Sequence, residues 1–191
     1  MENIINHFEK YLPLNDEEKQ ALMSRVTERK IKRRQFLLQE GDVCKYFTYV
    51  QSGCFKMYGV DDKGVEHNLV FAAEDDWISD IGSLHKELPS KLFIEAIEPS
   101  VVLQISKGDL WYLYSNHPKF DRNFRVIMED KYIELQNRLL QAFSSTALDR
   151  YDRFITQYPH LANRLPNTQI ASYLGVTPEF LSKIKNDRFK K

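Results

Sequence analysis

Residues 167–186, NTQIASYLGVTPEFLSKIKN, constrain the fold of this chain more than any other stretch. Apolar side chains recur at helical spacing on both sides of Gly175, a residue type that readily takes the left-handed backbone that ends a helix. Thr177 is a favourable N-cap, and Pro178 suits the first helical position because its missing N–H costs nothing there. The stretch therefore predicts two short helices joined by a tight turn.

The same stretch divides its side chains between a buried face and an outer face. Asn167 and Thr168 are N-cap types for the first helix, and Val176 is placed to fill the space between the helices. The buried positions are predicted to be Ile170, Ala171, Leu174, Leu181 and Ile184. This is the layout of a helix-turn-helix, whose second helix enters the major groove of DNA. An ordinary helical hairpin within a core is the alternative.

The outer side chains are the candidates for contact with double-stranded DNA. Acidic, amide and basic groups can meet base edges, whereas the later cations are better placed for phosphates, which carry affinity without sequence information. The candidate DNA-binding residues are Thr168, Gln169, Thr177, Pro178, Glu179, Phe180, Ser182, Lys183, Lys185, Asn186 and Arg188.

The charge distribution favours the DNA-binding interpretation. The chain is neutral overall, yet residues 147–191 hold eight basic and four acidic residues, a net charge of +4. The preceding residues hold 19 basic and 23 acidic residues, a net charge of −4. A basic end on an acidic body is expected of a protein that meets DNA through that end alone. A solvated C-terminus is the simpler alternative.

The pattern of the chain before this stretch changes twice. Residues 2–28 have a helical pattern that is broken at Pro13. From about residue 30 to residue 106, short β-rich runs alternate with turn signals, as in an all-β sandwich or barrel. These runs are 35–38, 47–51, 55–60, 66–71, 92–96 and 101–105. Helical patterns then return at 107–115, 119–145 and 147–158.

Residues 119–145 predict one helix about 40 Å long, because they contain neither glycine nor proline. One apolar seam runs along it, and a seam of this kind is either a packed spacer or a dimer interface. We favour the dimer, since helix-turn-helix proteins usually work in pairs on two half-sites. The predicted seam residues are Phe124, Met128, Tyr132, Leu135 and Leu139.

Other classes of site are disfavoured by the sequence. The two cysteines, Cys44 and Cys54, are expected to be reduced structural thiols of a cytoplasmic protein, with a disulfide as the alternative, and are too few for a four-thiolate iron–sulfur cluster. The five histidines are scattered, which argues against a metal-dependent enzyme of the cupin type, and no catalytic set is apparent. We expect no catalytic activity, no metal and no cofactor. No apolar run approaches the roughly 20 residues that span a bilayer, and the N-terminus is no secretion signal, so no membrane partner is expected.

Three short motifs before the helix-turn-helix carry a resemblance to a known family. They are Gln39-Glu40-Gly41-Asp42, Tyr49-Val50-Gln51-Ser52-Gly53 and Asp75-Asp76-Trp77-Ile78-Ser79-Asp80. With the C-terminal motif, they make the chain resemble the Crp–Fnr family of bacterial transcription regulators. The resemblance implies an α+β fold: an N-terminal double-stranded β-helix or jelly roll flanked by helices (1–118), a long dimerisation helix (119–145) and a winged or plain helix-turn-helix domain (146–191). It further implies a homodimer on a pseudo-palindromic promoter site, with RNA polymerase as a further candidate partner.

The chain departs from the family at the effector pocket. Family members that bind cyclic nucleotides carry a Glu for the ribose hydroxyl and an Arg for the phosphate, and here Asp80 and Ser90 stand at those positions. Lys91 beside Ser90 is a point charge rather than a planar fork. The resemblance therefore implies a pocket that is not built for an ordinary cyclic nucleotide and whose effector, if any, is unknown. The candidate pocket residues are Asp80, Ile81, Gly82, Ser83, Ser90, Lys91 and Tyr132.

The recognition helix departs from the family as well. Pro178 replaces an Arg of the best-known members, Glu179 keeps their acidic residue and Lys183 takes a later basic position. Glu179 can accept a hydrogen bond from cytosine, Lys183 can donate one to guanine and Phe180 can contact a thymine methyl. The alternative function is a ligand-sensing or dimerisation module of the same fold without specific DNA binding.

Overall fold

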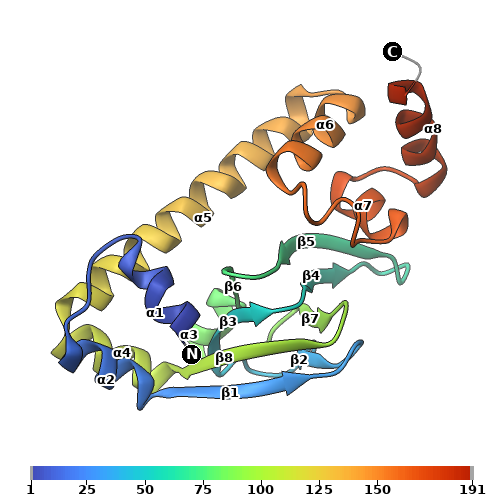
Figure 1. Ribbon diagram of the computed structural model, residues 1–191. Coiled ribbons are helices and arrows are strands. Elements are labelled where there is room, and N and C mark those ends of the chain that lie inside the picture. The colour runs from blue at the N-terminus through green and yellow to red at the C-terminus, as the bar shows by residue number, and fades with distance from the viewer. Residues whose placement is uncertain (1, 190–191) are drawn as a thin grey trace. The chain divides into compact units, whose positions relative to one another are not determined.

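A computed structural model describes the backbone of residues 2–189 and the side chains as far as Asp187 (Figure 1). The helices are α1 (Glu2–Glu9), α2 (Asp16–Met23), α3 (Ile81–Lys86), α4 (Lys107–Asn116), α5 (Pro118–Ser144), α6 (Ala147–Gln157), α7 (Asn167–Leu174) and α8 (Pro178–Phe189). The strands are β1 (Val26–Ile31), β2 (Phe36–Leu38), β3 (Tyr46–Ser52), β4 (Phe55–Val60), β5 (Glu66–Ala72), β6 (Trp77–Ile78), β7 (Phe93–Ala96) and β8 (Ser100–Ser106).

These elements form two compact units. Unit 1 comprises the described residues up to Tyr58 together with Phe71–Asp130, and unit 2 comprises Gly59–Val70 together with the described residues from Lys131 onward. The tip of the β4–β5 hairpin and the second half of α5 thus belong to unit 2.

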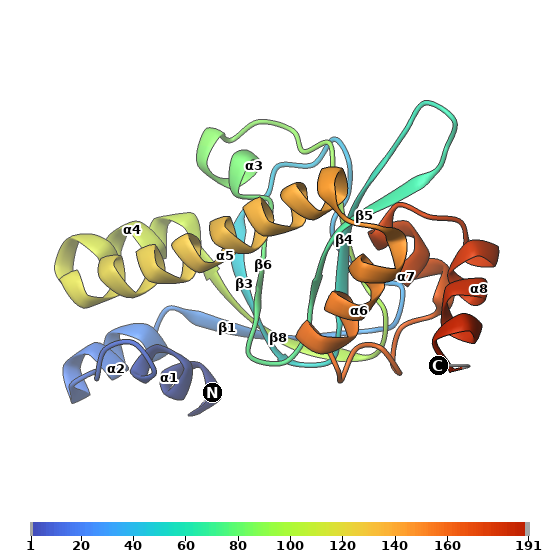
Figure 2. The same ribbon diagram turned by 90° about the horizontal axis from the view of Figure 1, so that it is seen from above.

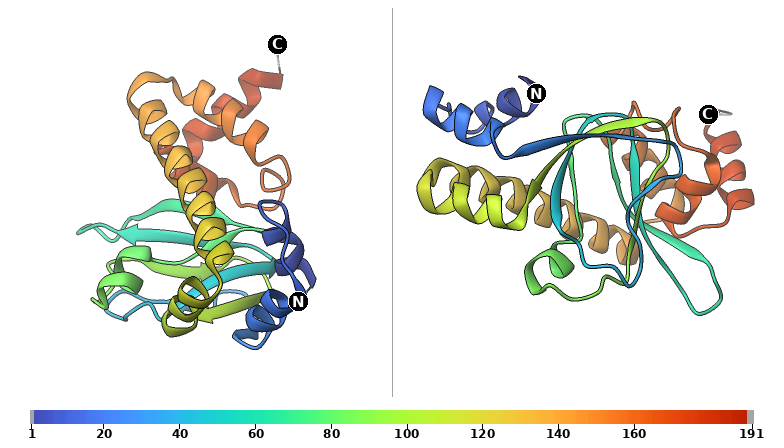
Figure 3. Two further views of the ribbon diagram at one scale, coloured as in Figure 1. Left: turned by 90° about the vertical axis from the view of Figure 1, so that its left-hand side faces the viewer. Right: turned by 90° about the horizontal axis from the view of Figure 1, so that it is seen from below.

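Unit 1 contains the predicted jelly roll, referred to below as the β-roll. One antiparallel sheet has the order β1-β8-β3-β6 and the other has the order β2-β7-β4-β5. In the first sheet, β8 pairs on both sides, with Ile105 opposite Val26 of β1 and opposite Phe47 of β3. All three side chains are buried in the core, which lies where the sheets face each other (Figure 3).

The core of unit 1 is rich in aromatic rings. Trp77 stacks on Phe47 with ring centroids 4.6 Å apart, and its indole N–H donates to Nε2 of His7 at 3.0 Å. Phe124 of α5 meets Trp77 edge-on at 5.4 Å and is only 3% exposed. The prediction that Phe124 belongs to an intermolecular seam is therefore wrong, because the first half of α5 uses this side chain to pack on its own sheet. Trp77 is a core residue, 4% exposed.

A single glycine sets the turn after β3. Gly53 has φ +95°, and a Cβ atom on it would lie 2.1 Å from Oγ of Ser100. Its N–H donates to Oε1 of Glu74 at 2.8 Å. Any other residue would collide with the start of β8, so the motif needs glycine at this position.

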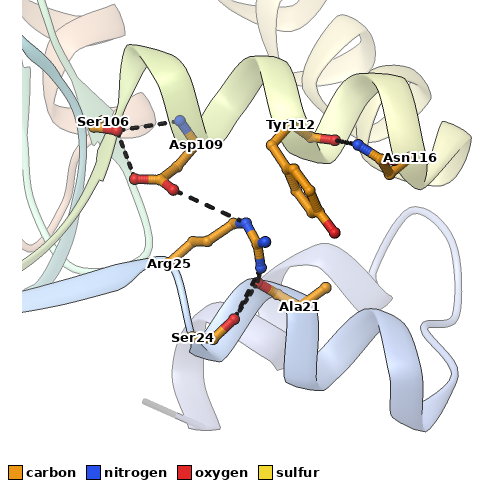
Figure 4. A network of polar contacts seen from close by, with 7 residues as sticks. All are labelled: Ala21, Ser24, Arg25, Ser106, Asp109, Tyr112 and Asn116. Atoms are coloured by element: carbon orange, nitrogen blue, oxygen red, sulfur yellow. Dashed lines mark hydrogen bonds and ion pairs between the residues drawn. The ribbon is translucent and has the colours of Figure 1, made fainter.

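Arg25 joins the end of α2 to α4 (Figure 4). Its guanidinium lies 3.5 Å from the centroid of the Tyr112 ring and donates to the carbonyl oxygen of Ala21 at 3.0 Å. On the other side, its Nε lies 3.9 Å from Oδ1 of Asp109, whose Oδ2 accepts from Oγ of Ser106. One planar cation thus ties the end of α2 to the first two turns of α4.

Unit 2 contains the C-terminal helices and the hairpin tip (Figure 2). Helix α6 begins with a capping box in which Thr146 and Asp149 satisfy each other's backbone N–H groups. Its Tyr151 and Phe154 are buried. From Lys131 to Phe189 every regular element of the described chain is a helix, so no β-wing accompanies α7 and α8 there.

The remaining differences from the predicted elements concern short segments. The helical pattern assigned to residues 2–28 ends at Met23, and Val26–Ile31 forms a strand paired along its whole length with β8. The two-residue strand β6 was not predicted, because two residues show no periodicity.

Candidate DNA-binding surface and effector turn

The first helix of the predicted motif starts differently from expectation. Pro166 occupies the N-cap of α7 and makes no side-chain cap, so the prediction that Asn167 or Thr168 caps this helix is wrong. Instead Oδ1 of Asn167 accepts from Nζ of Lys185 on α8 at 2.5 Å. This hydrogen bond ties the beginning of α7 to α8.

The turn between the two helices is built as the sequence predicts. Gly175 is left-handed, with φ +67° and ψ +40°, and the N–H of Val176 donates to the carbonyl of Ala171 at 3.0 Å. Oγ1 of Thr177 then accepts from the N–H of Phe180 at 3.2 Å, and Pro178 is the first residue of α8. These local bonds fix the angle at which α8 leaves the turn.

Helix α8 turns its apolar residues inward and its candidate contact residues outward. Leu181 and Ile184 are buried, whereas Phe180 is 47% exposed. The other exposed candidates on the two helices and their turn are Thr168, Thr177, Glu179, Ser182, Lys183 and Asn186. Pro178 and Lys185 are half-buried, and the side chain of Arg188 lies outside the described residues.

Gln169 is the candidate that the structure places elsewhere. Its Oε1 accepts from Nδ2 of Asn68 at 2.9 Å, so its side chain is engaged by the β4–β5 hairpin. Asn68 was not predicted as a functional residue, and the two positions lie 101 residues apart in sequence. No local pattern could have linked them.

The candidate pocket residues of unit 1 from Asp80 to Lys91 lie in a segment that we call the effector turn. Side chains of this turn bond to one another. Asp80 caps α3, its Oδ1 accepting from the N–H of Ser83 at 3.1 Å. Its Oδ2 accepts from Oγ of Ser90 at 2.7 Å. Ser90 is held in turn by backbone hydrogen bonds to Gly41 and Asp42 of the first family motif. The side chains at the two positions where nucleotide-binding family members hold the sugar and the phosphate are thus bonded to each other.

The other pocket candidates add no fixed cation to this turn. Ser83 is buried, and its Oγ donates to the carbonyl of Leu88 and accepts from the N–H of Cys44. Ile81 is half-buried, and Gly82 and Lys91 are exposed. Tyr132 belongs to unit 2 and is 61% exposed on α5.

The second half of α5 carries a broad exposed apolar stripe. Met128 packs on the core of unit 1, and the stripe begins one turn later. Its members are Tyr132, Ile133, Leu135, Leu139, Leu140 and Phe143. Three of the five predicted seam residues are thus exposed on one face, and the structure adds Ile133, Leu140 and Phe143 to them.

Other candidate chemistry is limited in the part of the chain that the structure describes. Cys44 and Cys54 are buried and form no disulfide with each other, and burial raises the pKa of the Cys44 thiol. No three His, Cys, Asp or Glu side chains among residues 2–187 gather in a way that could hold a metal ion. None of the described helices has both the length and the apolar character that a bilayer crossing requires.

Several known proteins share this architecture. Residues 28–117 match the family model of the cyclic nucleotide-binding domain. FixK2 from Bradyrhizobium japonicum is similar over 86% of this chain and 85% of its own, with a TM-score of 0.74 and 18% identity. A protein assigned to the crp/fnr family of transcriptional regulators, from Eubacterium rectale, is similar over 94% of this chain and 85% of its own (TM-score 0.72, 16% identity). The chain has the Crp–Fnr fold.

The sequence differs widely from those of the solved structures that share this fold. The c-di-GMP-responsive regulator CLP from Xanthomonas campestris is similar over 92% of each chain, with a TM-score of 0.71 and 13% identity. A search of curated proteins found no match to the sequence. The Crp–Fnr fold therefore rests on architecture, and the function has to be argued from the residues of this chain.

Proposed function

We propose that this chain is a dimeric, sequence-specific DNA-binding transcription regulator of the Crp–Fnr type. The observation that supports it most is the α7–α8 pair, which has a left-handed glycine turn and an exposed outer face on α8. The fold supports the same function by analogy. In this account the protein is a cytoplasmic bacterial regulator without enzymatic activity, and RNA polymerase is a further partner.

The base contacts follow from the exposed side chains of α8. Glu179 accepts from a cytosine amino group, Phe180 contacts a thymine methyl and Lys183 donates to guanine. The other exposed candidates, and the later cations of the chain, hold the phosphate backbone. Because Pro178 replaces a basic residue at the start of the helix, the preferred site differs from that of the best-known family members.

The dimer forms through the second half of α5. Its apolar stripe is exposed, while Glu134, Arg138 and Gln141 on the other side of the helix are half-buried. An exposed apolar stripe this long is rare on a monomeric protein and fits a second copy of the same helix. Two copies would present two α8 helices to half-sites about one turn of DNA apart, roughly 34 Å.

The sensor unit takes no ordinary cyclic nucleotide in this account. Asp80 and Ser90 occupy each other's hydrogen-bonding groups, and the described turn offers no guanidinium to a cyclic phosphate. Either another ligand acts there or the pocket has lost its ligand. A thermal shift screen tests this: cyclic AMP and cyclic GMP should leave the unfolding temperature unchanged, and a saturable rise with either would contradict the assignment.

DNA binding itself is tested by fluorescence anisotropy with a labelled random-sequence duplex at several salt concentrations. Since the contacts to phosphates release counterions, log Kd should rise linearly with log salt. The alternative, a sensing or dimerisation module without DNA binding, predicts no saturable signal. Binding that did not depend on salt would also contradict the proposal.

A further inference from the structure

The β4–β5 hairpin tip, residues 59–70, packs with the DNA-reading helices in unit 2. Strands β4 and β5 both continue into unit 1, so the same two strands belong to the β-roll and to the C-terminal unit. Strand β5 runs beside α7 (Figures 1 and 2). The residues that make this contact show how closely the hairpin and the helix are joined.

Asn68 is the centre of the contact. It is 2% exposed, and its Nδ2 donates both to the carbonyl oxygen of Gln169, at 3.1 Å, and to Oε1 of the same residue, at 2.9 Å. Its backbone N–H donates to Oγ of Ser172 at 3.0 Å, and that hydroxyl donates to the carbonyl of Glu66 at 2.6 Å. These bonds fix the register of α7 along β5.

Arg138 of α5 donates hydrogen bonds to both the hairpin and α7. Its Nη2 donates to the carbonyl oxygens of Asn68 and Tyr173, both at 2.9 Å, and its Nη1 donates to the carbonyl of Leu69. The guanidinium lies 3.8 Å from the centroid of the Tyr173 ring, and burial lowers the pKa of Arg138. Charge-assisted hydrogen bonds from this half-buried cation to carbonyl oxygens of both elements favour keeping β5 and α7 together.

The hairpin docks on a face of α7 that leaves the reading surface of α8 open. Gln169 and Ser172 bond to the hairpin, whereas Glu179, Phe180 and Lys183 stay exposed. The shared turn and the Asn167–Lys185 hydrogen bond connect α7 to α8, so the position of α7 determines the position of α8. The docked hairpin is thus compatible with DNA binding and restricts how α8 is presented.

We propose that Asn68 is a positioning residue for DNA binding. The β4–β5 hairpin tip is then a structural part of the DNA-binding surface that α7 and α8 form. The inference rests on the proposed function.

The test compares Asn68→Asp with Asn163→Asp in the full-length protein. Both variants add one negative charge to unit 2, but Asn163 is exposed and makes no side-chain hydrogen bond in the described structure. An aspartate at position 68 cannot donate to Gln169, so Kd for a random-sequence duplex should rise about tenfold, against less than about twofold for the control. Hydrogen exchange of the α7 backbone amides should be faster than in the wild type for Asn68→Asp and unchanged for Asn163→Asp.

The outcomes separate this inference from the proposed function. Equal Kd values for the two variants, with salt-dependent binding by the wild type, would overturn the positioning role alone. Absence of DNA binding by the wild type would overturn both. A merely structural role would lower the unfolding temperature of Asn68→Asp and leave Kd, measured well below that temperature, unchanged. If circular dichroism shows that Asn68→Asp does not fold, Asn68→Ala is compared with Asn163→Ala in the same assay.

Discussion

Asn123 lies on α5 and is fully buried in unit 1, and neither its Nδ2 nor its Oδ1 has a hydrogen-bond partner among the described residues. Leaving such a group unsatisfied costs about 1–3 kcal/mol. Replacing Asn123 by leucine, which is similar in size, should therefore raise the free energy of unfolding by about that amount. Urea denaturation measures it, with Asn6→Leu on the exposed face of α1 as a near-neutral control. A loss of stability would show that the amide has a partner, such as a buried water.

Asp75 links stability to pH through a hydrogen bond from Tyr49. The Tyr49 hydroxyl donates to Oδ1 of Asp75 at 2.5 Å, and this bond, with a smaller effect from Lys10, lowers the pKa of Asp75 below its usual value. A carboxyl whose pKa is lower in the folded state stabilises the fold above its unfolded pKa and ceases to do so as the pH falls through the folded one. Tyr49→Phe should thus be less stable than the wild type at neutral pH, and the difference should narrow below about pH 4. A difference that stayed constant with pH would contradict this.

At the level of elements, the turn between α7 and α8 depends on the left-handed conformation of Gly175. Gly175→Ala should destabilise the protein by about 1 kcal/mol, because a Cβ disfavours this conformation. Gly108→Ala is the matched comparison: Gly108 lies within α4, and a Cβ there meets only Oγ of Ser106 at 3.9 Å. It should leave stability unchanged or raise it by up to about 1 kcal/mol. Equal thermal midpoints for the two variants would argue against the turn as described.

Elements whose signals are local could be predicted from the sequence. The glycine turn and the N-cap at Thr177 depend on neighbouring residues, and they formed as expected. Two contacts could not be predicted, because they join distant parts of the chain. The periodicity of α5 includes Phe124, yet only the packing of unit 1 shows that this ring points into the core. The contact of Asn68 could not be predicted for the same reason, since its partner on α7 lies far along the chain.

For the whole molecule, the exposed stripe of α5 predicts a dimer that a single charge should break. Leu139 is 57% exposed within the stripe, and a glutamate there would place two carboxylates in an apolar interface. Leu139→Glu should sediment as a monomer of 22.6 kDa and bind DNA at least about tenfold more weakly, because two half-sites are no longer engaged together. Asn163→Glu carries the same added charge outside the stripe and should remain dimeric. A wild-type protein that is already monomeric would contradict the α5 dimer.

The central claim is that two copies of α8 read DNA, and selection of bound duplexes from a random pool tests it most directly. The wild type should enrich a two-fold symmetric site with half-sites about 10 base pairs apart, and Glu179→Ala should relax the preference at one position in each half-site. Asn163→Ala should select the wild-type site. A pool that showed no enriched sequence after selection with the wild type, or an unchanged site with Glu179→Ala, would contradict the account.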